Sequence, residues 1–310
     1  MGGVPRMITL CLLLVNLFIV PLLLVGIIRK VKAIMQTRVG APVLQPYYDI
    51  AKLLCKGETV SETASWIFRW TPIIGLGVAA IVAVLVPWAG AILPDGWATA
   101  TNFLLIIYLL ALGKFLAMLS AMDTGSAFGG LGASREATIS LLVEPAMMMG
   151  LGALAVGAGS TDLHTIFTSP MHPLVALLVG GVLVISALAE LSRMPVDDPT
   201  THLELTMVHE AMILDNSGRN LALTEYAVAL RSCIFLGIAS QTLLHLWPGF
   251  TSLSVLSRYG CSLGALFLTG ISVAIAEGVL VKLKWRRVPN FLAAAIVMSL
   301  FAVLLAVVQH

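Results

Sequence analysis

The chain has 310 residues, of which 59% are hydrophobic and only 11% are charged, and its mean hydropathy is +0.98. Because soluble globular domains carry about 25% charged residues, this composition excludes a soluble protein and predicts a single integral membrane domain over residues 1–310. The formal net charge of +2 gives no reason to expect a nucleic-acid partner.

Eight apolar stretches are long enough, at about 20 residues, to cross the hydrocarbon core of a bilayer. Backbone polar groups cannot stay unpaired in hydrocarbon, so these stretches must be helices. The predicted fold is therefore an all-α polytopic membrane protein with eight transmembrane helices. The predicted spans are residues 8–28, 73–93, 101–121, 137–157, 174–191, 222–244, 260–281 and 290–309.

Basic residues alternate between the two sides of this arrangement when the loops are numbered in chain order. The side opposite to loops 1, 3, 5 and 7 has only Arg6 and Arg258. By the positive-inside rule, the odd-numbered loops are predicted to be cytoplasmic and both termini to lie outside. The odd-numbered loops hold Arg29, Lys30, Lys32, Arg38, Lys52, Lys56, Arg69, Arg135, Arg193, Arg219, Lys282, Lys284, Arg286 and Arg287.

Two of these loops have recognisable local patterns. In loop 1, apolar residues recur at helical spacing over residues 47–54, which predicts a short amphipathic helix on the membrane surface. Loop 3 contains Gly125, Gly129, Gly130 and Gly132, which predict tight turns and close approach of the backbone. Loop 3 lacks Gly-Lys-Ser/Thr and a preceding strand, so no nucleotide site is expected.

The segment from Glu190 to Tyr226, which includes loop 5, holds seven of the sixteen acidic residues. One interpretation is a solvated loop. The other is a loop folded back against the helices, which is favoured by interleaved apolar residues and by Pro195 and Pro199 around an aspartate pair. The seven acidic residues are Glu190, Asp197, Asp198, Glu204, Glu210, Asp215 and Glu225.

Ionisable residues also occur inside the predicted spans, where they are costly and so are functional candidates. Each has a structural alternative, as an ion pair or as a side chain that reaches the interface. Four of the carboxylates fall toward the cytoplasmic side, next to loop 5, and together they predict a chain of proton-exchanging groups with two basic partners. The predicted path comprises Glu144, Glu190, Asp197, Asp198, Glu204, Glu210, Glu225, Glu277, Lys114 and Arg231.

The four cysteines are isolated in the sequence, at Cys11, Cys55, Cys233 and Cys261. There is no Cys-x-x-Cys pair and no Cys/His cluster, so this chain is expected to bind no zinc and no iron–sulfur cluster. No catalytic residue is expected either.

Several motifs in order resemble the subunit 1 family of respiratory complex I, and most of all its branch in formate hydrogenlyase and related energy-converting nickel–iron hydrogenases. The likeness runs from about residue 29 to residue 290. Asp-Thr-Gly-Ser and Gly-Ala-Ser-Arg-Glu favour the hydrogenase branch. The motifs lie at Arg38–Pro42 with Gln45, Asp49 and Lys52, at Met122–Ser126, at Gly132–Ala137, at Glu144–Pro145 and at Ala189–Asp197.

The resemblance implies an eight-helix, non-catalytic subunit in the plasma membrane of a prokaryote. Such a subunit anchors a peripheral redox arm and begins a glutamate-lined path for protons or sodium toward antiporter-like subunits. Hydrogenase-like large and small peripheral subunits, with iron–sulfur clusters and in some cases a nickel–iron site, are the implied partners. The residues implied to dock these partners are Arg38, Gln45, Asp49, Asp123 and Arg135.

The sequence departs from the family pattern in loop 5, where Thr200 and His202 replace two acidic residues. Three functions stay open at this point. The chain is a coupling subunit of a hydrogenase-like complex, which the motifs favour, or a subunit of a true complex I that helps to bind a quinone. The third, a stand-alone secondary transporter, is less favoured because the two halves show no internal repeat.

Overall fold

The computed structural model describes residues 6–88, 101–197, 207–247, 249–250 and 252–309. Within them, α1 (Arg6–Phe18) and α2 (Val20–Met35) meet at a bend of 41° and are long and apolar enough to cross a membrane only when taken together. Seven further helices are long and apolar enough to cross a membrane, so the all-α fold with up to eight spans is confirmed for these residues. The seven are α4 (Trp66–Leu85), α5 (Phe103–Asp123), α6 (Ala127–Ala158), α8 (Pro173–Glu190), α10 (Gly218–Leu244), α11 (Val255–Val279) and α12 (Val288–Gln309).

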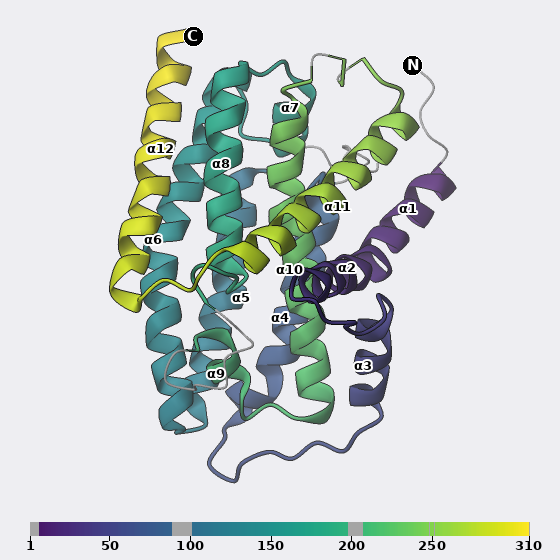
Figure 1. Ribbon diagram of the computed structural model, residues 1–310, viewed down its shortest axis with the longest axis vertical. Coiled ribbons are helices and arrows are strands. Elements are labelled where there is room, and N and C mark those ends of the chain that lie inside the picture. Colours follow the sequence, from purple (N-terminus) through teal and green to yellow (C-terminus); the bar gives the residue numbers. More distant parts are fainter. Residues whose placement is uncertain (1–5, 89–100, 198–206, 248, 251, 310) are drawn as a thin grey trace.

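The central helix of the bundle is α10, which packs against α2, α3, α4, α8 and α11. On one side, α6, α8 and α12 pack on one another, and α11 slants across the face that Figure 1 shows. Three short α-helices connect the spans, together with the 3-10 helix η3 just before α12. These are α3 (Gln45–Leu54), α7 (Leu163–Thr168), α9 (His209–Ile213) and η3 (Trp285–Arg287).

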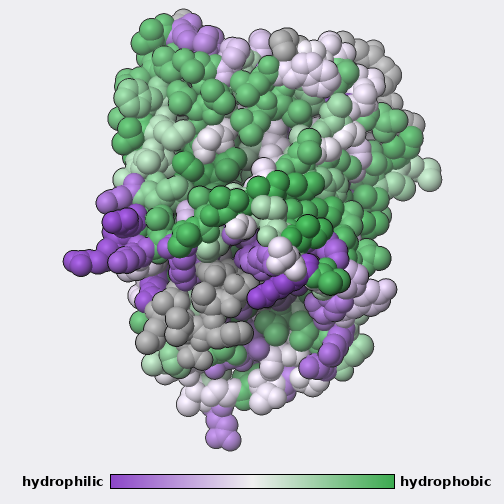
Figure 2. Space-filling view, viewed as in Figure 1, coloured by the Kyte–Doolittle hydropathy of each residue, from purple (hydrophilic) through white to green (hydrophobic). Residues whose placement is uncertain are grey.

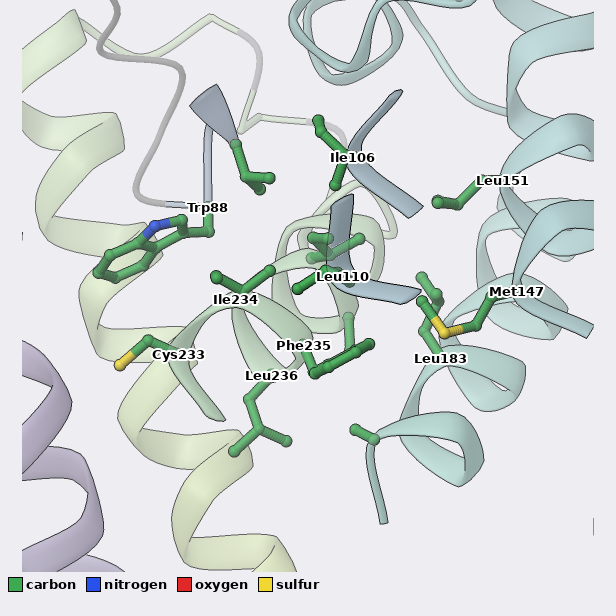
Figure 3. Close-up of a cluster of buried hydrophobic side chains, with 14 of the residues drawn as sticks. Trp88, Ile106, Leu110, Met147, Leu151, Leu183, Cys233, Ile234, Phe235 and Leu236 are labelled. Carbon is green, nitrogen blue, oxygen red and sulfur yellow. The ribbon is translucent and has the colours of Figure 1, made fainter. Parts of the chain in front are cut away.

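The apolar core lies where α10 meets its neighbours. Side chains from α5, α6, α8 and α10 converge there with Trp88, which follows α4 (Figure 3). The Trp88 indole donates to the carbonyl of Ala83, and the side chain of Gln241 donates to the carbonyl of Trp88. The residues that directly follow α4, up to Trp88, are therefore held against α10.

The bend between α1 and α2 follows from Pro21, which has no N–H to donate to the carbonyl of Leu17 four residues earlier. The Tyr226 hydroxyl, from α10, donates to that carbonyl at 2.7 Å. The Tyr47 hydroxyl, from α3, donates to the carbonyl of Ile19. Two tyrosines from distant parts of the chain thus bond to backbone carbonyls at the break.

Several helices begin earlier or end later than hydropathy predicts, and α6 is the largest case. It begins at residue 127, whereas the span was predicted from residue 137, so the predicted loop 3 is mostly helix. The turn is limited to Gly125, which has φ +69°. The close approach is confirmed at Gly132, because a Cβ there would lie 2.8 Å from the carbonyl oxygen of Val208.

The short helix predicted in loop 1 is α3, and its apolar face packs on the protein. Tyr47 and Ile50 lie against Leu22 and Val25 of α2 and Ala229 of α10. This face was predicted to lie on the membrane surface. The structure instead places α3 against α2 and α10, so that loop 1 is joined to the bundle.

The described part of loop 5 is folded back onto the bundle, which confirms the second interpretation for these residues. Asp197 is 1% exposed, and Met212 of α9 packs with Ala121 and Ala133. Two predicted path residues, Asp198 and Glu204, lie outside the described residues. Figure 2 shows a mostly apolar upper part of the molecule, with hydrophilic side chains gathered in the part below the start of α12.

Candidate functional site

Three ionised side chains meet inside the bundle, each from a different helix. The Lys114 ammonium of α5 lies 2.6 Å from a carboxylate oxygen of Glu136 on α6 and 2.8 Å from one of Glu190 on α8. The three side chains are 6%, 4% and 9% exposed. We call Lys114, Glu136 and Glu190 the buried triad. Its charges are removed from water, so each depends on the others for stabilisation.

The depth of the triad can be judged from its neighbour Arg135. The Arg135 guanidinium lies over the ring of Trp285, 5.4 Å from the ring centroid, directly before α12 begins. Tryptophan collects at the membrane–water interface, so Arg135 and Glu136 lie near that level. Glu144 is nine residues farther along α6 than Arg135, which places it about 13 Å deeper at 1.5 Å per residue.

A second group of charges joins loop 5 to the ends of α2 and α11. Glu277 is 1% exposed and lies 3.3 Å from Lys32 and 3.1 Å from Arg193. Asp197 lies 2.9 Å from Lys282 and accepts a hydrogen bond from the backbone N–H of Val208 at 2.9 Å. Glu277 and Asp197 are therefore held by structural ion pairs, as the alternative interpretation of the sequence allowed.

A third, more open group lies where α2, α3 and α10 meet. Arg29 lies 3.7 Å from Glu225 and 3.8 Å from Asp49, with about half of the arginine side chain exposed. Gln45 donates to Asp49 at 2.8 Å. These long, accessible ion pairs contribute little to stability, so the carboxylates are free to change partner.

The three groups line adjoining cavities. A large cavity of about 820 Å³ lies between α2, α3, α10 and loop 5, and its lining includes Asp49, Asp197, Glu210, Glu225 and Glu277. A small cavity of about 20 Å³ adjoins it and is lined by the buried triad together with His209 and Arg231. A third cavity of about 10 Å³ is lined by Lys114, Glu190 and Glu144.

Two neighbours in α9 have shifted pKa values. Burial lowers the pKa of His209 to about 4, and the positive charge of Arg231 adds to this. Burial raises the pKa of Glu210, the Glu225 carboxylate raises it further, and Arg29 opposes the shift. At neutral pH, His209 is therefore a neutral imidazole, and Glu210 holds its proton more tightly than an exposed glutamate does.

Most of the predicted docking residues have contacts within this chain. The Asp123 carboxylate accepts from the backbone N–H of Ser65 at 2.7 Å and of Phe68 at 3.3 Å, at the start of α4. Arg135 donates to the carbonyl of Met207 at 3.1 Å. Gln45 and Asp49 bond to each other, as described above, and Arg38 is exposed. Docking therefore stays a prediction, and Arg38 is its best test.

Sequence reasoning missed Glu136, the second acid of the buried triad. Glu136 lies in the Gly-Ala-Ser-Arg-Glu motif, one residue before the span that was predicted from residue 137. It was therefore counted as part of a loop. His209 was not among the predicted path residues, and the pairing of Lys32 and Arg193 with Glu277 had no signal in the sequence. Among the described residues, no group of three or more His, Cys, Asp or Glu side chains could hold a metal ion.

With its bundle of up to eight spans and its buried ionic core, the chain is a multi-pass membrane subunit of a complex I-like or hydrogenase-type respiratory complex. The chain belongs to the NADH dehydrogenase family, whose model matches residues 8–308. This is the subunit 1 family of complex I that the motifs indicated.

Two relatives from Escherichia coli (strain K12) support the hydrogenase branch. Formate hydrogenlyase subunit 4 is 33% identical over 227 residues, which cover 71% of this chain and 72% of the relative. Hydrogenase-4 component C is 33% identical over 219 residues, which cover 68% of this chain and 67% of the relative. A subunit of the NADH-quinone oxidoreductase of Anaplasma phagocytophilum (strain HZ) is 29% identical, over 77% of this chain and 79% of the relative.

A solved structure shares the fold. It is a chain of the membrane-bound sulfane sulfur reductase, an archaeal respiratory membrane complex, with a TM-score of 0.78. The alignment covers 96% of this chain and 98% of that chain at 18% sequence identity. At this identity the likeness supports the fold of the whole chain and not its chemistry.

Proposed function

We propose that this subunit anchors hydrogenase-like peripheral subunits and passes protons from their side of the membrane toward antiporter-like membrane subunits. The observation that carries the proposal is the series of three adjoining cavities. Their lining residues lead from Glu225 and Glu210, through the buried triad, to Glu144. Iron–sulfur clusters and any nickel–iron site would belong to the partner subunits.

The charges around the two small cavities suit proton uptake. Lys114 and Arg231 carry two positive charges, and Glu136, Glu190 and Glu144 carry three negative charges when all are ionised. One added proton makes this set neutral, which a low-dielectric interior favours. Glu144 and Glu190 line a cavity with Lys114, so a shift of the lysine toward Glu144 would release a carboxylate of the triad to accept that proton.

Neutral variants in the complete complex test this proposal. Glu144→Gln and Glu190→Gln keep the size and hydrogen bonding of each side chain and remove its proton. We expect both variants to assemble and to lower the membrane potential formed per electron in reconstituted vesicles. Unchanged potential and turnover in both variants would contradict the proposal.

The control for these variants is Glu62→Gln, because Glu62 is exposed in loop 1 and lines none of the three cavities. Glu58, another acidic residue of loop 1, is unsuitable as a control. Its carboxylate accepts a hydrogen bond from the side chain of Asn220 on α10, one and a half turns before Glu225.

Anchoring of the peripheral subunits is tested at Arg38. This residue is exposed and belongs to the first family motif. Arg38→Glu should release the peripheral subunits on purification in mild detergent while this chain stays in the membrane. Full retention of the partners in the variant would remove Arg38 from the docking surface. Arg135→Glu would be ambiguous, since Arg135 already holds Met207 and Trp285 of its own chain.

A second candidate function, quinone binding, is favoured by the size of the large cavity. At about 820 Å³ it falls within the range of small-molecule sites, and its lining mixes apolar and charged side chains. A quinone-site subunit would make turnover of the purified complex depend on added quinone. Turnover that is independent of quinone, with hydrogen or another small product as the electron sink, would support the hydrogenase-like function.

A further inference from the structure

His209 has a position that no other ionisable side chain of the described residues shares. It lines both the large cavity and the small cavity. Among the described residues, the others common to the two linings are Leu191 and Val228, whose side chains cannot carry a proton. Along the described walls, a proton that moves between the two cavities therefore passes His209 or crosses an apolar surface.

Five side-chain atoms on residues that line the small cavity have no hydrogen-bond partner within the part of the chain that the structure describes, and two of them, Lys114 Nζ and Glu190 Oε1, form an ion pair with each other. The other three are Nε2 of His209, Nε of Arg231 and Oε2 of Glu136. A buried polar atom without a partner is unfavourable, because it has lost its hydrogen bonds to water. Three such atoms around one cavity indicate that something polar fills it.

The size of the small cavity limits what this occupant is. A volume of about 20 Å³ holds roughly one water molecule. One water has enough donors and acceptors for all three atoms: it can accept from the Arg231 Nε–H, donate to the Glu136 carboxylate and exchange a hydrogen bond with His209 Nε2. Two positive side chains face two carboxylates here, so the cavity has no net charge that would favour an ion over water.

We propose that His209 transfers protons between the large cavity and the buried triad, through one water bound in the small cavity. This inference rests on the proposed function. A proton is taken up at Nδ1 of His209 while another leaves Nε2 for the water, and the water in turn gives a proton to Glu136 or Glu190. The imidazole then returns to its first tautomer, so no proton is gained or lost by the ring.

The surroundings of His209 suit a group that transfers protons without storing them. Burial and the positive charges of Arg231 and Lys114 oppose protonation of the ring, and Glu225 and Asp197 favour it less strongly, so that the pKa falls to about 4. The imidazolium is therefore short-lived near neutral pH. A neutral imidazole offers one donor and one acceptor nitrogen, which transfer through the ring requires.

The test uses His209→Ala and His209→Gln in the complete complex, reconstituted in vesicles, with membrane potential per electron as the readout. We expect both variants to assemble and to lose as much of the potential as Glu144→Gln does, because neither side chain exchanges protons. The alanine variant leaves a space beside the large cavity that imidazole fits. Added imidazole should therefore restore the potential in His209→Ala, but not in Glu144→Gln. A permeant base collapses a pH gradient, so the potential is the readout to use.

The outcomes separate this inference from the proposed function. If Glu144→Gln abolishes the potential and His209→Ala leaves it unchanged, protons bypass His209 and the inference is wrong while the path stands. If His209→Ala assembles, loses the potential and is not restored by imidazole, His209 has a structural role and the inference is again wrong. If Glu144→Gln, Glu190→Gln and His209→Ala are all silent, the proposed function itself fails.

Discussion

Replacing Lys114 by methionine should cost this protein a large part of its stability. The change keeps an unbranched side chain as far as Cε and removes the ammonium that lies 2.6 Å from Glu136 and 2.8 Å from Glu190. Both carboxylates are less than a tenth exposed, so neither gains water in exchange. Breaking a buried ion pair typically costs about 3–5 kcal/mol. Because Lys114→Met leaves two buried carboxylates without their partner, we expect it to lower the free energy of unfolding by about 5 kcal/mol.

The reasoning is checked with a second variant in which the stranded charges are also removed. Lys114→Met combined with Glu136→Gln and Glu190→Gln keeps the packing of the triad and removes all three of its charges. Since replacing a whole buried ion pair by neutral groups is often close to neutral in stability, this triple variant should recover most of the loss.

The free energy of unfolding can be measured by titration with sodium dodecyl sulfate in mixed micelles, with far-ultraviolet circular dichroism as the signal. A cost below about 1 kcal/mol for Lys114→Met, which is the value of an exposed pair, would show that the triad is open to water. A triple variant no more stable than Lys114→Met would show that the loss comes from packing and not from charge.

Three further predictions follow from the described contacts. Gly132→Ala should lower the melting temperature in detergent, because its Cβ would lie 2.8 Å from the carbonyl oxygen of Val208, whereas Gly152→Ala, with open space at its Cβ, should not. The lowered pKa of His209 predicts that its contribution to the free energy of unfolding is fully present above about pH 6.5 and is lost as the pH falls toward about 4. In His209→Gln, the free energy of unfolding should therefore depend less on pH over that range. Arg286 is exposed, so Arg286→Cys, as the only cysteine of the chain, should react with a membrane-impermeant maleimide in inside-out vesicles and not in intact cells. Reaction in intact cells and not in inside-out vesicles would show that the predicted topology is inverted.

The sequence was enough for the number of spans and for most acids of the site. Hydropathy identifies helices because each span must satisfy its backbone within itself. It misplaces their ends, because a helix that continues beyond the bilayer is no longer apolar. The error in the predicted start was largest at α6, which begins ten residues earlier than predicted, and these ten residues include Glu136.

The partners of each charge could not be predicted, since they come from helices far apart in the chain. Lys114 and Arg231 were predicted to be the basic partners of the path carboxylates, and the structure pairs Lys114 with Glu136 and Glu190. The Nε of Arg231 has no hydrogen-bond partner among the described residues. Helix periodicity fixes which face a residue occupies, but the packing of α5, α6 and α8 decides which faces meet.

The break at Pro21 links Tyr226 of α10 to Leu17 of α1, a contact that hydropathy does not predict. The Tyr226 hydroxyl replaces, for the carbonyl of Leu17, the N–H that proline lacks. With alanine at position 21, the helix could supply that N–H itself and the hydroxyl would be spare. Loss of the hydroxyl should therefore be tolerated in a Pro21→Ala background and costly with Pro21 present. Among related chains, the proline and the tyrosine are then expected to vary together, as a covarying pair that marks where the first span packs on α10.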